Sequence, residues 1–514
     1  MLSRIKTATL VGVKGYPVTV ETDIHSGMPN FSIVGLADTT IRESYSRVRP
    51  AVVNSGYSFP DRKITVNLVP AGRPKEGSHF DLPIALGLIM QGHGIYDTED
   101  TAFFGELSLD GRLNRIKGAL PLAMCMRKAG IRNIVLPESN AEEASIIEDI
   151  NIYAAKDLRE AASFLSGCTD KGIYKRKKKY ISREYDNDFS QVIGQESAKR
   201  AIVIGAAGSH GLLFMGGPGC GKTMLAKRIP SVLPDLSYEE KLEITGIYSV
   251  AGLLSDEEPV ITRRPFRSPH HTISAACLTG GGLKPRPGEM SLAHGGVLFL
   301  DELGEFDARA VDAMRQPAED GFVRVSRNMD EMVFPADTMI VAAANPCKCG
   351  YLWDERRMCT CSRKQLEAHR RRLAGPFSDR IDMHIKVMPI EKEAITLVGT
   401  ECNASETVGT TSDAMRAQVM AARQIQQMRY KGTGYKNNGG LDEKGIGIYC
   451  RLDADCRNLL DSAYEKYGLS MRAYMKILKI SRTIADLAGE DDIMCEHVAE
   501  ALVYRITEWD RNII

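Results

Sequence analysis

A glycine-rich segment that ends in a lysine and a threonine carries the clearest chemical signature in the sequence. An apolar run at 212–215 precedes a loop made of Gly216, Gly217, Pro218, Gly219, Cys220, Gly221, Lys222 and Thr223. Glycines let backbone N–H groups converge on phosphate oxygens, and the N-terminus of a following helix adds positive potential. The spacing G-x-x-x-x-G-K-[ST] therefore predicts an ATP site in which Lys222 contacts the β- and γ-phosphates and the Thr223 hydroxyl binds Mg²⁺.

Polar side chains end two further apolar runs. Asp301 and Glu302 follow the run at 297–300, and the run MIVAAAN ends at Asn345. An α/β sheet places its site at the carboxyl ends of its strands, so we expect these groups beside the phosphate loop. Asp301 would complete the Mg²⁺ site, Glu302 would act as general base, and Asn345 would orient the attacking water. The plainer alternatives are acids at a surface strand end and a turn residue before a proline.

Four cysteines come in two closely spaced pairs just after Asn345. These are Cys347 with Cys349 and Cys359 with Cys361. Two thiol pairs about ten residues apart could surround one tetrahedral Zn²⁺. C-x-C pairs are less typical of zinc sites than C-x₂-C pairs, so reduced structural thiols and redox chemistry remain alternatives.

The elements that position these groups are expected in an α/β multidomain protein. At roughly 150 residues per domain, 514 residues predict about three domains. We expect an N-terminal domain at 1–170, a charged linker at 171–188, an ATPase core at 189–389 and a helical C-terminal region at 390–514. The charged linker is either a solvated run of charges or a contact for the phosphate backbone of a nucleic acid.

Hydrophobic patterning supports this division. In the N-terminal part, strand-like and helix-like stretches alternate, as expected of an α/β domain; they span 17–24, 63–70, 81–90 and 119–129. In the C-terminal part, apolar residues recur at helical spacing and indicate one buried helix face; they are Ile477, Ile480, Ile484 and Leu487.

Composition excludes several classes of protein. Lys+Arg and Asp+Glu are equal at 66 each, so the chain is not a polycation as a whole, although local basic patches remain possible. No apolar run approaches the roughly 18–20 residues of a membrane span, and the N-terminus lacks the pattern of a signal peptide. Twelve cysteines are too sparse for a disulfide scaffold. We therefore expect a cytoplasmic protein with no membrane partner.

Several longer motifs lie outside the phosphate loop. They are FRSPHHTIS (266–274), PGEMSLAHGGVLFLDE (287–302), RQPAEDG (315–321), GPFSDRIDMHI (375–385) and LSMRAYMKILKISRTIADL (469–487). With these motifs in this order, the chain resembles AAA+ ATPases of the magnesium-chelatase/MCM branch and, more closely, the ComM/YifB family.

This resemblance implies a homo-hexameric ring with ATP bound between subunits. It implies that Arg380 is an arginine finger supplied to a neighbour's nucleotide, and that Arg472 is a second sensor acting in cis or in trans. From spacing alone, either arginine could form an ordinary ion pair. The resemblance further implies an ATP-dependent DNA motor that drives branch migration in homologous recombination during natural transformation.

The same branch of ATPases carries an insert in helix 2 and a hairpin before the first sensor. Here these correspond to 266–291 and 320–335. Basic side chains in the two segments could contact nucleic acid phosphates or could be ordinary surface charges; they are Arg324, Arg327, Lys284 and Arg286. His270 and His271 in the insert could equally have a structural or intersubunit role.

The N-terminal part resembles the Lon proteolytic domain. The similar segments are 73–88 and 105–130. At the positions of the catalytic serine and lysine, the chain has His79 and Leu120, and a leucine cannot activate a hydroxyl. The resemblance therefore implies a non-proteolytic domain, with a shifted Ser78–Lys117 pair as the alternative. Magnesium chelatase activity and ATP-dependent protein remodelling or proteolysis are the competing functions.

Overall fold

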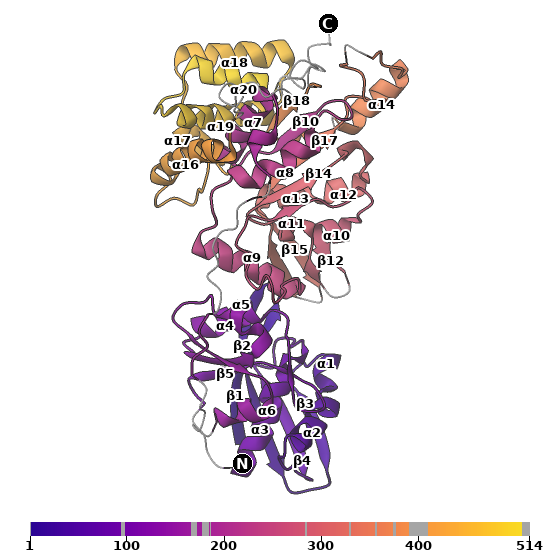
Figure 1. Cartoon of the computed structure of the whole chain (residues 1–514), viewed down its shortest axis with the longest axis vertical. Helices are drawn as coiled ribbons and strands as arrows, with labels where there is room; N and C mark the ends of the chain where they lie inside the picture. The colour runs from indigo at the N-terminus through magenta and orange to yellow at the C-terminus, as the bar shows by residue number, and fades with distance from the viewer. Residues whose placement is uncertain are drawn as a thin grey trace, which may run out of the picture.

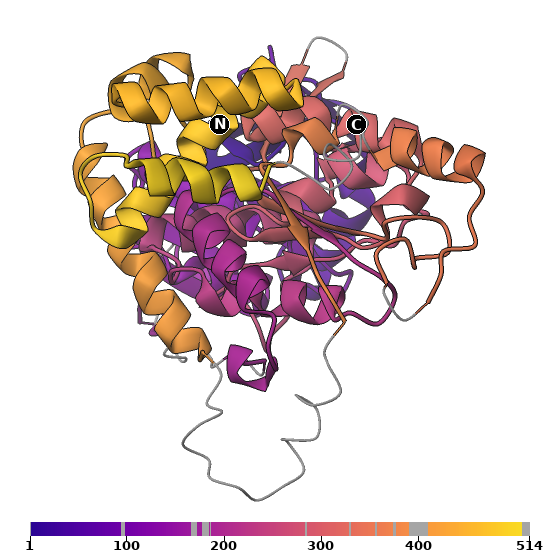
Figure 2. The ribbon, with the colours of Figure 1, turned by 90° about the horizontal axis from the view of Figure 1, so that it is seen from above.

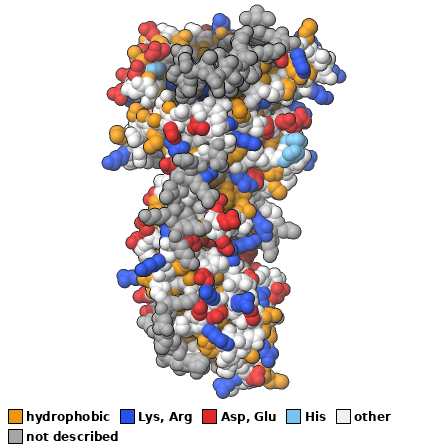
Figure 3. All heavy atoms as spheres, in the orientation of Figure 1, with side chains coloured by type: hydrophobic (Ala, Val, Ile, Leu, Met, Phe, Trp, Pro, Cys, Tyr) orange, Lys and Arg blue, Asp and Glu red, His pale blue; other side chains and the backbone are white. Residues whose placement is uncertain are grey.

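A computed structural model describes most of the chain. The described residues are 2–93, 98–165, 172–176, 185, 187–282, 285–327, 330–354, 357–373, 377–389 and 410–505. They form an elongated molecule with two lobes and a narrower waist (Figures 1 and 3). On the face in Figure 3, acidic and basic side chains are interspersed, as the balanced composition predicts.

The N-terminal lobe is built on a mixed seven-stranded sheet with the order β3-β4-β2-β1-β5-β8-β9. Its strands are β1 (Leu2–Val11), β2 (Lys14–His25), β3 (Asn30–Val34), β4 (Lys63–Val69), β5 (Thr101–Phe103), β8 (Asn133–Pro137) and β9 (Asn151–Ala155). The pairs β1–β2 and β2–β4 are antiparallel, whereas β1–β5, β5–β8, β8–β9 and β3–β4 are parallel.

Short helices and a small ribbon complete this lobe. The helices are α1 (Thr39–Arg42), α2 (Ser44–Asn54), η1 (Ser78–Phe80), α3 (Asp81–His93), α4 (Ala119–Lys128), α5 (Glu138–Ala144) and α6 (Leu158–Ser163), and the ribbon pairs β6 (Glu106–Leu107) with β7 (Leu113–Asn114). The predicted alternation of strands and helices is confirmed: β2 and β4 cover the expected strands, and α3 and α4 cover the expected helices.

The second lobe contains a five-stranded, all-parallel sheet with the order β11-β14-β17-β10-β18. Its strands are β10 (Leu212–Met215), β11 (Phe266–Arg267), β14 (Val297–Leu300), β17 (Met339–Ala344) and β18 (Met383–Lys386). Both faces of a parallel sheet are covered, which explains why its strands are continuous apolar runs. Leu212 and Phe214 pack into one core, and Leu213 and Met215 into the core on the opposite face.

Helices and small ribbons surround this sheet. They are η2 (Phe189–Gln191), α7 (Glu196–Gly208), α8 (Lys222–Val232), α9 (Tyr238–Ala251), α10 (Ala275–Thr279), β12 (Gly280–Gly281), β13 (Arg286–Pro287), α11 (Glu289–Leu292), η3 (Leu303–Glu305), α12 (Ala308–Ala313), α13 (Arg315–Asp320), α14 (Arg363–Leu373) and η4 (Ser378–Arg380). The hairpin expected within 320–335 is present as antiparallel strands β15 (Phe322–Arg327) and β16 (Asp330–Pro335).

The described C-terminal residues form a helical unit that packs against one side of the second sheet, opposite α14 (Figures 1 and 2). Its helices are α16 (Ser412–Arg429), α17 (Glu443–Tyr449), α18 (Ala454–Tyr467), α19 (Met471–Ala488) and α20 (Cys495–Val503). The predicted buried face of α19 is confirmed, because Ile477, Ile480 and Ile484 are buried and Leu487 packs against the same core. This core is continuous with one face of the sheet.

The two lobes meet through α4 and α9. Leu242 and Val260 of the second lobe are buried in a cluster made mainly by residues of the first. The Gly118 N–H donates to the Ser249 carbonyl over 3.0 Å, and the Ser249 hydroxyl donates to the Glu143 carboxylate. Burial raises the pKa of Glu143, and hydrogen bonds, the largest from Ser249, oppose this shift. The lobes are therefore joined by apolar packing and by a buried polar network.

Among the described residues, no helix has the length and apolar character needed to cross a membrane.

Candidate nucleotide site

The phosphate loop lies at the carboxyl end of β10, between β17 and β18. Helix α8 begins at Lys222, so the loop turns directly into a helix N-terminus. Gly219 and Gly221 adopt φ values of 76° and 86°, which favour glycine. This local structure agrees with the sequence prediction of a strand, a loop and a helix.

Lys222 lies inside this loop and joins it to β17. Its ammonium donates to the carbonyls of Gly216 and Gly217, at 2.7 and 2.8 Å, and to Asn345 Oδ1 at 3.0 Å. Burial lowers the pKa of Lys222, while the negative charges of neighbouring groups, among them Asp301 and Glu302, oppose this shift. The ammonium is thus held where an incoming phosphate would meet it.

Thr223 and Asp301 form the second pair in the site. The Thr223 hydroxyl donates to Asp301 Oδ2 over 2.8 Å. A hydroxyl and a carboxylate are oxygen ligands of the kind Mg²⁺ prefers, so the two side chains fit the predicted metal position. The parallel pairing of β10 with β17, and of β17 with β14, brings these distant segments together.

Glu302 adopts an unusual backbone conformation and has a partner that sequence reasoning did not identify. Its φ is 55°, in the left-handed region, and its side chain is exposed. His271 Nδ1 lies 3.8 Å from Glu302 Oε2. The contact arises because β11 pairs in parallel with β14, which places the residues after Arg267 beside those after Leu300. The FRSPHHTIS motif therefore touches the predicted general base, although its two histidines alone gave no sign of this contact.

Arg380 and Arg472 lie together at the opposite edge of the same sheet. Arg380 Nε is 2.8 Å from Glu319 Oε1, and Arg472 Nη2 is 4.0 Å from the same oxygen. Arg380 lies just before β18 begins, whereas the phosphate loop follows the end of neighbouring β10. A four-residue strand spans about 13 Å, so both arginines lie beyond the far end of the sheet from the loop of their own chain.

A partly buried carboxylate holds the C-terminal helices at this edge. Asp382 accepts from the Gly211 N–H over 2.8 Å and lies 2.9 Å from Lys476 Nζ of α19. Burial opposes ionisation of Asp382, but the charge of Lys476 and the hydrogen bond from His210 hold its pKa well below the usual range. The ionised pair therefore ties α19, which carries Arg472, to the start of β18.

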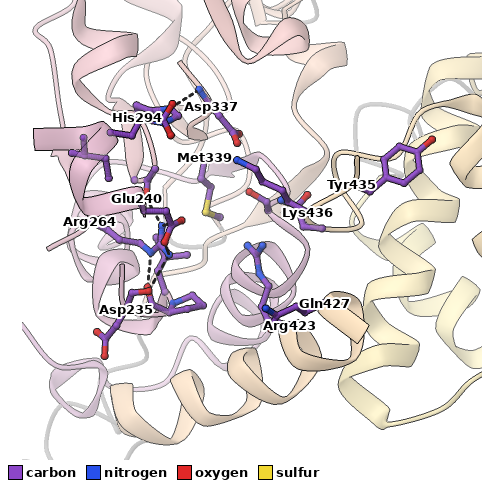
Figure 4. Close-up of a pocket in the computed structure, with 18 of the residues that line it drawn as sticks. Asp235, Glu240, Arg264, His294, Asp337, Met339, Arg423, Gln427, Tyr435 and Lys436 are labelled. Carbon is purple, nitrogen blue, oxygen red and sulfur yellow. Dashed lines mark hydrogen bonds and ion pairs between the residues drawn. The ribbon is translucent and has the colours of Figure 1, made fainter. Parts of the chain in front are cut away.

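A cavity of about 530 Å³ opens at this edge between the sheet and the C-terminal helices (Figure 4). Arg423 from α16 points toward this cavity. Arg264 lies on the opposite side of the cavity and donates a hydrogen bond to Glu240. Arg423 donates to the Ala206 carbonyl over 2.8 Å, and burial lowers its pKa to about 10. Sequence reasoning did not identify this cavity, because its lining comes from segments that are far apart along the chain.

The predicted nucleic acid contacts lie on exposed short elements. Arg324 of β15 is exposed and pairs with Glu331 of β16 over 2.9 Å, and Arg286 is exposed on β13. Lys284 and the side chain of Arg327 lie outside the described residues. Hairpin β15–β16 also meets the N-terminal lobe, since a side chain on Gly12 would contact Met332 at 3.6 Å.

The four cysteines after Asn345 form one cluster. The sulfur atoms of Cys347, Cys349, Cys359 and Cys361 all lie within 4.8 Å of one another. Two C-x-C pairs were an intermediate signal in the sequence, and the fold brings them together.

The residues that sequence analysis aligned with the catalytic pair of Lon make structural contacts in the N-terminal lobe. His79 is buried and its Nε2 bonds to the Ala8 carbonyl over 2.9 Å, while Leu120 is fully buried. The Ser78 hydroxyl donates to Glu106. Lys117 instead packs along Gly252, where an added Cβ would lie 2.8 Å from Lys117 Cε. These contacts engage Ser78 and Lys117 with different partners.

Comparison with known families covers most of the chain. Residues 188–395 match the family described as magnesium chelatase, subunit ChlI. Residues 20–140 match subunit ChlI of Mg-chelatase, and residues 409–505 match the C-terminal region of that subunit.

Individual relatives match over nearly their whole length. The chain is 41% identical to YifB of Escherichia coli, over 98% of this chain and 97% of the relative. It is 40% identical to the competence protein ComM of Haemophilus influenzae, with the same coverage of both chains. It is 37% identical to protein Rv2897c of Mycobacterium tuberculosis, over 98% of this chain and 99% of that protein. The chain therefore belongs to the ComM/YifB family of magnesium-chelatase-like AAA+ ATPases.

Proposed function

We propose that this protein is an ATP-driven hexameric motor that moves the branch point of joined DNA molecules during homologous recombination. The observation that carries the proposal is the cluster of Lys222, Thr223, Asp301 and Asn345 at one edge of the parallel sheet. Similarity to a protein named for competence supports recombination of incoming DNA as its process.

In this proposal, the chain's own residues divide the work of ATP hydrolysis. The phosphate loop and Lys222 bind the triphosphate, and Thr223 and Asp301 hold the Mg²⁺, which neutralises phosphate charge when bound. Glu302 accepts a proton from the attacking water, and Asn345 orients that water. His271 positions the Glu302 carboxylate between turnovers.

The location of the arginines supports a ring with shared sites. Arg380 and Arg472 lie at the opposite sheet edge from the phosphate loop of their own chain, so they would reach a neighbour's nucleotide. An arginine that meets the γ-phosphate accelerates phosphoryl transfer strongly. Glu319 would release both arginines when that nucleotide arrives. We therefore place Arg472 in trans.

We propose that the helix-2 insert and hairpin β15–β16 face the DNA. Arg324 is exposed and its pairing with Glu331 is a surface contact, which costs little to break. The N-terminal lobe is proposed to be a non-proteolytic Lon-like domain that braces the hairpin through the turn at Gly12. The C-terminal helices are proposed to be the lid of the ATPase.

The test is ATP turnover without DNA, with single strands, with duplex and with a mobile four-way junction, scoring strand exchange in the same samples. Junction-stimulated turnover with strand exchange supports the proposal, and Glu302→Gln should lose both activities. Arg324→Glu should weaken DNA binding and reduce its salt dependence. Arg4→Glu is the matched control, because Arg4 is also an exposed strand arginine paired with a glutamate.

The second candidate is a chelatase-type ATPase, favoured by the matches to subunit ChlI. Turnover that is indifferent to every DNA would contradict the motor and favour this candidate or a protein-remodelling role. Release of labelled peptides from casein would contradict the non-proteolytic assignment of the N-terminal lobe.

A further inference from the structure

We propose that Cys347, Cys349, Cys359 and Cys361 hold a structural Zn²⁺, and that the zinc-bound loop braces the phosphate loop. The metal site goes beyond the proposed function, whereas the bracing role rests on it. Both parts follow from the geometry of the segment between β17 and α14.

The sulfur separations fit a tetrahedral metal. Cys347 Sγ lies 3.3 Å from Cys349 Sγ and 3.7 Å from Cys359 Sγ, and the last two are 3.5 Å apart. Tetrahedral zinc with Zn–S bonds of about 2.3 Å requires sulfur atoms about 3.8 Å apart. These three sulfur atoms are too far apart for a disulfide, which needs about 2.05 Å, and Cys361 Sγ lies within 4.8 Å of each of them, so all four could bind one ion.

The loop contributes few buried side chains, although Trp353 packs against the core of the sheet and Lys386 Nζ lies 5.6 Å from its ring. Of its described residues between Cys349 and Cys359, Gly350 alone is buried, and Met358 is 92% exposed. A metal bound at the four sulfur atoms would add to these contacts and stabilise the loop further. An all-sulfur tetrahedral site suits zinc, with iron as the main competitor.

The loop touches the phosphate loop directly. Gly350 has a φ of 86°, and a Cβ at this position would lie 2.6 Å from Pro218 Cδ. In turn, a Cβ on Gly217 would lie 3.1 Å from the Gly350 carbonyl. The two loops therefore pack backbone against backbone, and displacement of one must move the other.

Both ends of the loop reach catalytic positions. Asn345, two residues before the first cysteine, accepts from Lys222. Beyond the last cysteine, His369 of α14 bonds through Nε2 to the Asn345 carbonyl over 2.9 Å. His369 also borders Gly304, which follows Glu302 by two residues. Zinc at the four sulfurs would thus hold both Asn345 and α14 in register with the phosphate loop.

The metal is tested on the full chain, purified without chelator, by elemental analysis. We expect one zinc per chain in the wild type and in Cys277→Ser, a control at an exposed cysteine outside the cluster. The double variant Cys359→Ser/Cys361→Ser should lose the metal. Less than a tenth of an equivalent, with no uptake of added Zn²⁺ under reducing conditions, would overturn the site. Iron in place of zinc would overturn the choice of metal.

The brace is tested with Gly350→Ala, which leaves every cysteine intact. It should retain one zinc but weaken binding of a fluorescent ATP analogue by roughly tenfold to a hundredfold, since small misplacements of binding groups are costly. Gly432→Ala is the matched control, because Gly432 has a φ of 80° and nothing lies near its added Cβ. Unchanged affinity in Gly350→Ala would overturn the brace. A wild type that binds zinc but no nucleotide would refute the proposed function and the brace, and would leave the metal site standing.

Discussion

Replacement of Lys222 by alanine tests the ATP site most directly. In the nucleotide-free chain the ammonium already donates to Gly216, Gly217 and Asn345, over 2.7, 2.8 and 3.0 Å. ATP binding exchanges some of these contacts for contacts with two charged phosphates. Hydrogen bonds to charged groups contribute about 1.5–3 kcal/mol each, so two contribute about 3–6 kcal/mol before this exchange is counted.

Because ATP binding breaks some of the existing hydrogen bonds of Lys222, we expect the net loss of binding free energy to lie at the lower end of that range. A loss of about 3 kcal/mol corresponds to an ATP affinity roughly 100-fold weaker. Calorimetry or a fluorescent ATP analogue measures this change, and turnover should fall with it. Lys227→Ala is the control, because Lys227 lies on the same helix and is exposed. A Kd for Lys222→Ala within threefold of the wild-type value, in a folded variant, would refute the assignment of this lysine to the phosphates.

Three further predictions concern the base, the finger and the N-terminal lobe. Glu302→Gln should bind ATP normally but hydrolyse it roughly 100- to 10,000-fold more slowly, as single-turnover kinetics will show; normal hydrolysis would assign the base elsewhere. Arg380→Ala should lose ATP turnover, but mixing it with Lys222→Ala subunits should restore part of the turnover, because an intact phosphate loop can then meet an intact Arg380 of the neighbouring subunit. Absence of this rescue would argue against action in trans. Burial lowers the pKa of His79 to about 4, so the unfolded state binds a proton that the folded state does not as pH falls below 6.5. Acidification from pH 7 to 5 should therefore cost the wild type about 2 kcal/mol more than His79→Gln in urea unfolding, and equal losses would contradict the neutral buried histidine.

The phosphate loop was predictable because its structure is local. Strand β10, the loop and helix α8 are consecutive, and the backbone freedom of Gly219 and of the N-cap residue Gly221 operates over a few residues. The buried face of α19 was predictable for the same reason, since helical spacing acts within one element, whereas hairpin β15–β16 was expected from the family resemblance.

Contacts between distant segments depended on the order of the strands. The sequence indicated that Asp301 and Asn345 end strands, but the parallel order β14-β17-β10 brought them to Thr223 and Lys222. The pairing of β11 with β14 likewise set His271 against Glu302, the predicted general base.

The residue types and their local spacing thus predicted a phosphate site, a general base and paired thiols, and the family resemblance added the two arginines. The tertiary structure alone decided which of these groups meet. It placed Glu319 between Arg380 and Arg472 at the far edge of the sheet, and it closed four sulfur atoms into one cluster beside the phosphate loop. The physical reason is that such meetings depend on burying both faces of a parallel sheet, and that burial is a property of the whole fold rather than of any short segment.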